Sequence, residues 1–70
     1  MTFESMVFVT REQALSFFNK VARDSVAFLC KGNNVVPDRP AYFVFNETDY
    51  TKYYNEKDWG LDLTLELCSE

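Results

Sequence analysis

The sequence predicts an α+β domain: one four-stranded antiparallel sheet with two helices on one face, a two-layer arrangement. Two short helical patterns interrupt four strand-like runs in the order β-α-β-β-α-β. Seventy residues are too few to form a second hydrophobic core, so residues 1–70 are expected to form a single domain. Seven Phe, four Tyr and one Trp supply the apolar surface that so short a chain must bury.

The first strand and the first helix follow each other directly. Residues 3–9 are rich in β-branched and aromatic side chains, which indicates a strand. Thr10 stands three residues before Gln13, and this capping-box spacing predicts that a helix begins after Thr10. The apolar residues of this helix recur at three- and four-residue spacing on one stripe: Ala14, Leu15, Phe17, Phe18, Val21 and Ala22.

The remaining elements are two strands, a helix and a final strand. Residues 26–30 and 41–45 are apolar runs of strand type, separated by a connection rich in Gly, Asn and Pro. Asn46 is a suitable cap for a second helix, on which Tyr50, Tyr53 and Tyr54 share one face. In residues 61–68, leucines alternate with other residues, which predicts a strand with one buried face and one solvent-exposed face.

This order of elements favours the ferredoxin-like split βαβ arrangement. The first and third strands would be central, and the second and fourth would lie at opposite edges. Cys30 and Cys68 would then be too far apart for a disulfide. A different strand order remains the alternative. The sheet face away from the helices would stay open and aromatic, which favours an interface or a homodimer through the sheet.

The composition argues against most catalytic chemistry. The chain has no histidine, which excludes Ser-His and Cys-His nucleophilic sites and His-ligated zinc. Its two cysteines form no C-x-x-C pair, and so few thiols in an apolar chain favour a reducing cytoplasm. We therefore expect a protein that is not an enzyme, with no catalytic residues, no metal and no cofactor.

The charge distribution narrows the class of partner. The net charge is −4 and the pI is about 4.6, so direct binding to nucleic acid is disfavoured. The acid is concentrated in residues 46–70, whose balance is −5 (2 − 7), against +1 (5 − 4) in residues 1–45. No apolar run reaches the length of about 20 residues that a membrane helix needs. These features favour a cytoplasmic protein, or one in the host cytoplasm if the protein is viral.

Aromatic and acidic residues of the last third form the candidate partner-binding surface. Aromatic anchors beside a polar rim are typical of protein interfaces, and spaced carboxylates imitate part of the field of nucleic acid. The competing interpretation is that the tyrosines cover the sheet and that the carboxylates only keep the domain soluble. The candidate residues are Asp49, Tyr50, Tyr53, Glu56, Asp58, Trp59, Asp62 and Glu66.

Two functions are consistent with these patterns. The first is a small acidic inhibitor or adaptor that docks on a basic, nucleic-acid-binding site of a partner protein. By analogy of size and charge alone, such proteins include phage-encoded anti-defence factors of the anti-CRISPR or anti-restriction kind, which act as nucleic-acid mimics. The alternative is a dimeric regulatory module that binds a small molecule between residues 32–40 and a helix end.

Overall fold

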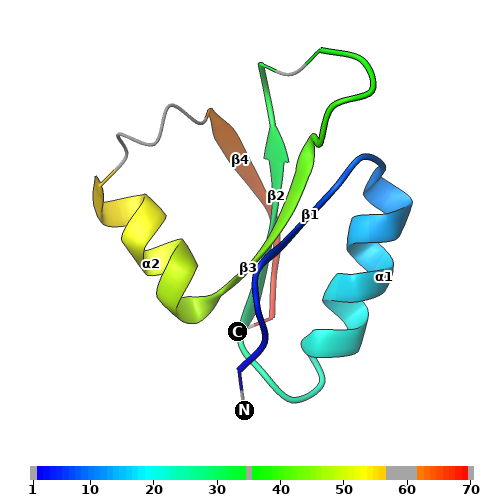
Figure 1. The fold of residues 1–70 in the computed structure, drawn as a ribbon. Coiled ribbons are helices and arrows are strands. Elements are labelled where there is room, and N and C mark those ends of the chain that lie inside the picture. The colour runs from blue at the N-terminus through cyan, green and yellow to red at the C-terminus, as the bar shows by residue number, and fades with distance from the viewer. Residues whose placement is uncertain (1, 35, 57–61, 70) are drawn as a thin grey trace.

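The computed structural model describes residues 2–34, 36–56 and 62–69. The elements follow the predicted order: β1 (Met6–Phe8), α1 (Arg11–Val21), β2 (Ala27–Gly32), β3 (Tyr42–Asn46), α2 (Glu47–Glu56) and β4 (Leu63–Cys68). The α+β class and the single four-stranded antiparallel sheet are confirmed (Figure 1). Thr10 caps α1 as expected, because its hydroxyl oxygen accepts a hydrogen bond from the backbone N–H of Gln13 at 3.3 Å.

The strand order is the point at which the structure departs from the ferredoxin-like expectation. The order is β1-β3-β2-β4, so the central strands are β3 and β2. The cause is that β4 pairs with β2 and not with β1. Cys30 and Cys68 consequently lie on neighbouring strands instead of opposite edges, with Phe28 opposite Cys68 and Leu65 opposite Cys30.

The two helices lie on opposite faces of the sheet. In β2, Ala27 and Leu29 belong to the apolar cluster beneath α1. Their neighbours Phe28 and Cys30 belong to a second cluster, together with Tyr50 of α2. Since successive side chains of a strand point to opposite faces, the sheet separates α1 from α2 (Figure 1). The structure therefore corrects the expectation of two helices on one face and an open face behind them.

The strand order explains this separation. The β1–α1–β2 and β3–α2–β4 connections each pass one intervening strand, and both move toward the β4 edge. Because β1 and β3 are antiparallel, the two connections start in opposite directions. Two crossovers of the usual right-handed sense must then fall on opposite faces. In the ferredoxin-like order the second connection runs the other way, which brings both helices to one face.

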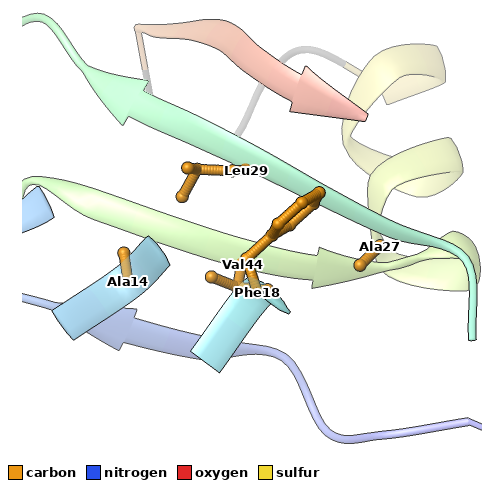
Figure 2. Close-up of a cluster of buried hydrophobic side chains, with 5 residues drawn as sticks. All are labelled: Ala14, Phe18, Ala27, Leu29 and Val44. Carbon is orange, nitrogen blue, oxygen red and sulfur yellow. The ribbon is translucent and has the colours of Figure 1, made fainter. Parts of the chain in front are cut away.

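More buried side chains lie beneath α1 than beneath α2. The buried cluster on the α1 side consists of Ala14, Phe18, Ala27, Leu29 and Val44 (Figure 2). On the other face, α2 has no buried residue of its own, although Tyr50 packs against the cluster that contains Phe28 and Phe45. The α1 side thus holds the larger buried cluster, and α2 covers the opposite face without burying a whole residue of its own.

A β-bulge in β4 divides the predicted leucine face. The register shifts between Leu29 and Cys30 of β2, which leaves Glu66 as the extra residue in β4. Leu67 therefore packs with the cluster beneath α1, whereas Leu63 packs with the cluster on the α2 side. The strand keeps its predicted place in the chain, but its leucines do not share one buried face.

Replacing Leu29 tests the position of the core. Leu29 has no exposed surface, so Leu29→Ala should lower the free energy of unfolding by about 2–5 kcal/mol, measured by urea denaturation. Leu65→Ala is the matched control, because the Leu65 side chain is 44% exposed and its truncation leaves little cavity. If Leu29→Ala does not fold, Leu29→Val should still lower stability by about 1 kcal/mol. Equal losses at the two leucines would contradict this assignment of the core.

Candidate functional site

The structure describes six of the eight candidate residues. Tyr50, Tyr53 and Glu56 lie on α2 together with Asp49, whereas Asp62 and Glu66 lie just before and within β4. Asp58 and Trp59 fall outside the described residues.

Asp49 takes part in a network that joins the first turn of α2 to the N-terminal segment. Asn46 caps α2 as the sequence predicts, because its Oδ1 accepts a hydrogen bond from the backbone N–H of Asp49 at 2.7 Å. The Asn46 side-chain amide donates to the carbonyl of Phe3 at 2.8 Å. The Ser5 hydroxyl accepts from the backbone N–H of Asn46 at 3.0 Å and donates to the Asp49 carboxylate at 2.5 Å. Asp49 thus has a structural role.

The two candidate tyrosines pack on the sheet. Tyr50 stacks on Phe28 with ring centroids 4.0 Å apart and an interplanar angle of 9°. Tyr53 lies 6.1 Å from Phe45 at 11°. Burial is the largest cause that raises the pKa of the Tyr50 phenol above its usual value of 10.0. For these two rings the competing interpretation, that they cover the sheet, fits the observed contacts.

Asp62 ties the start of β4 to the segment that follows β2. Its carboxylate accepts hydrogen bonds from the side-chain amides of Asn34 at 3.1 Å and Asn33 at 3.4 Å. The Asn33 amide also donates to the Thr64 hydroxyl at 2.9 Å, and the Asn33 backbone N–H donates to the carbonyl of Asp62 at 2.8 Å. This exposed carboxylate therefore helps to fix the register between β2 and β4.

Glu66 is paired with a cation from the α1 side. The Nε of Arg11, the first residue of α1, lies 3.0 Å from Glu66 Oε1. The side chains are 49% and 23% exposed, so this ion pair adds at most about 1 kcal/mol to stability. The bond to Arg11 places Glu66 on the α1 face of the sheet. The structure consequently separates this carboxylate from Tyr50 and Tyr53, which pack on the α2 face.

A pocket beside α2 combines aromatic walls with a carboxylate. This α2 pocket has a volume of about 330 Å³ and is lined by Phe28, Glu47, Tyr50, Thr51 and Tyr54. Tyr54 is 58% exposed, and its ring centroid lies 6.4 Å from that of Tyr50. Sequence reasoning put Tyr54 on the same helix face as Tyr50 but left Glu47 and Thr51 out of the candidate site.

The spacing of the helix residues could have identified three sides of this pocket. Glu47, Thr51 and Tyr54 stand four and three residues apart, which places them on one face of a helix together with Tyr50. No local signal could have added Phe28, because its place beneath α2 follows from the strand order.

Other sites receive little support from the described residues. Residues 32–34 and 36–40, which belong to the segment expected to hold a small molecule, do not line the α2 pocket or the two further pockets near Thr2 and Ser25. In the described ranges no three His, Cys, Asp or Glu side chains come together as a metal site. Within the same ranges, no helix is both long and apolar enough to cross a membrane.

Cys30 is a buried thiol on the α2 face. Burial, with a smaller contribution from the charge of Glu66, raises the pKa of the Cys30 thiol from 9.0 to about 12. The thiol therefore stays protonated at neutral pH, where it is a poor nucleophile. Cys68 is exposed, and the two cysteines do not form a disulfide.

Comparison with protein-family models, with curated proteins and with solved structures yields no match to this chain. The arrangement of its own residues is therefore the basis for a proposal about function.

The raised pKa of Cys30 predicts a loss of stability in alkaline solution. The protonated thiol stabilises the folded state fully below the unfolded-state pKa of 9.0, and this contribution is lost as the pH rises toward 12. Urea denaturation across this range should show a smaller fall in the free energy of unfolding for Cys30→Ala than for wild type. The matched control is Cys68→Ala, which removes an exposed thiol instead of a buried one and should keep more of the wild-type fall than Cys30→Ala. Identical profiles for wild type and Cys30→Ala would disprove this prediction.

Proposed function

We propose that this chain is a small acidic protein-binding domain, an inhibitor or adaptor, which docks α2 on a basic, nucleic-acid-binding site of a partner protein. The observation that carries the proposal is the exposure of α2, a helix with no buried residue. Its charge is −2 (1 − 3), from Lys52 against Glu47, Asp49 and Glu56. Tyr50 and Tyr53 pack on the sheet, and the outer surface of the helix, with its exposed acids and the exposed Tyr54, suits a basic groove.

The proposed surface differs from the one that the sequence suggested. Glu66 bonds to a residue of α1, and Asp62 bonds to the segment after β2, so neither carboxylate is placed beside the α2 tyrosines. The exposed acids of α2 are Glu47 in the first turn and Glu56 in the last turn. These two carboxylates would steer the domain toward a basic partner and compete with nucleic acid for it. A role as an anti-defence factor remains part of this proposal, on size and charge alone.

Charge reversal on α2 tests this proposal. The tagged domain serves as bait in a bacterial lysate at low and at high salt. We expect it to retain a nucleic-acid-binding protein that added salt or added DNA or RNA releases, because the contact is electrostatic. The double variant Glu47→Lys/Glu56→Lys should reduce this recovery by at least about tenfold, since four units of charge change at the interface.

The matched control carries the same charge change on the other face of the molecule. Glu12 lies in the first turn of α1 and Asp24 lies just beyond that helix; both are exposed. Glu12→Lys/Asp24→Lys should therefore keep wild-type recovery. An equal loss in both double variants would show that only net charge matters and would exclude a specific α2 surface. Recovery of the chain alone, as a homodimer, would favour the dimeric regulatory module.

A further inference from the structure

We infer that the α2 pocket, defined above by Phe28, Glu47, Tyr50, Thr51 and Tyr54, receives the side chain of one arginine from the partner protein. This inference rests on the proposed function and names the group that the α2 surface recognises. It follows from three properties of the pocket, which are its apolar wall, its exposed ring and its carboxylate.

The apolar wall matches the aliphatic part of an arginine. Phe28 is only 7% exposed and is fixed by its stacking against Tyr50, with the ring centroids 4.0 Å apart. Because Phe28 comes from the central strand β2, this wall is anchored in the sheet. Phe28 itself offers little free surface, so the methylene groups of an arginine side chain would bury against the half-buried ring of Tyr50, which Phe28 supports, while the charged head stays near water.

The exposed ring of Tyr54 suits the planar head of an arginine. Tyr54 is 58% exposed and is tilted by 32° against Tyr50. A guanidinium stacks on the face of an aromatic ring, and it does so more often than a lysine ammonium. A buried tyrosine would offer no such surface, so the exposure of Tyr54 is what allows a partner to use it.

Glu47 supplies the charge that complements the guanidinium. It lies two helical turns before Tyr54 and lines the same pocket. No described residue forms a hydrogen bond or an ion pair with its carboxylate. A carboxylate accepts two parallel N–H···O bonds from a guanidinium, which a lysine ammonium cannot provide in that geometry.

The size of the pocket is sufficient for one arginine side chain. About 330 Å³ is at the lower end of the range of roughly 300–1,000 Å³ that small-molecule sites occupy. Its lining combines aromatic rings with one acid, and arginine is among the residues that most often carry the binding energy of protein interfaces.

NMR titration of the whole ¹⁵N-labelled chain tests the inference without a known partner. The probe is N-acetyl-arginine amide, added at constant ionic strength so that general screening does not change. N-acetyl-lysine amide and N-acetyl-norleucine amide serve as the charged and the uncharged comparison. We expect saturable shifts for Phe28, Glu47, Tyr50, Thr51 and Tyr54 with the arginine probe, and weaker binding of the other two.

Single substitutions test how much each residue of the pocket contributes to binding of the arginine probe. Glu47→Gln should weaken the arginine probe about fivefold, because it removes the charge but keeps the shape. Tyr54→Ala should weaken it about threefold, and Tyr54→Phe should not, because phenylalanine keeps the ring face. Glu12→Gln is the control for Glu47→Gln, since Glu12 is an exposed first-turn acid of α1 on the opposite face.

The outcomes separate this inference from the proposed function. Shifts spread over all acidic residues, or equal binding of the three probes, would overturn the arginine pocket. If Glu47→Lys/Glu56→Lys still abolished partner recovery in that case, the proposed function would stand without the pocket. Saturable arginine binding in a chain that captures no basic partner would support the pocket and contradict the proposed function.

Discussion

The pairing of β4 with β2 is the contact on which the rest of the architecture depends. It places β2 in the centre of the sheet, so that both of its faces must be covered. It also sends the two helical connections in the same direction across the sheet, and their common handedness then puts α1 and α2 on opposite faces. Without this pairing, Phe28 would not lie beneath α2, and the α2 pocket would lose its apolar wall.

The two faces of the sheet differ in what they contribute. The α1 side holds the fully buried residues Leu29 and Val44, together with Ala14 and Phe18 of the helix. On the other side, aromatic stacking holds α2 in place and leaves Glu47 and Glu56 exposed. A helix that buries little of itself adds less to stability, but it keeps more surface for contact with another molecule. Because α2 is the more exposed helix, we place the partner surface on it.

Acidic residues that look alike in the sequence have different tasks in the structure. Asp49 bonds to Ser5, Asp62 bonds to two asparagines, and Glu66 pairs with Arg11. Each of these bonds joins residues more than 25 positions apart in the chain. The sequence shows where the carboxylates stand in the chain, but it does not show which distant donor forms a hydrogen bond with each of them. The same holds for Glu47, whose place in the pocket depends on the aromatic side chains beside it.

The sequence by itself determined the elements and their caps, because these depend on neighbours within a few residues. The capping roles of Thr10 and Asn46 and the order of the six elements were readable from local patterns. Only the tertiary structure decided the strand order, the separation of the helices and the bulge at Glu66. Several strand orders are compatible with the same local patterns, and the pairing between strands that are distant in the chain determines which one forms. The candidate site depends on that choice, so the sequence predicted its tyrosines but not the pocket.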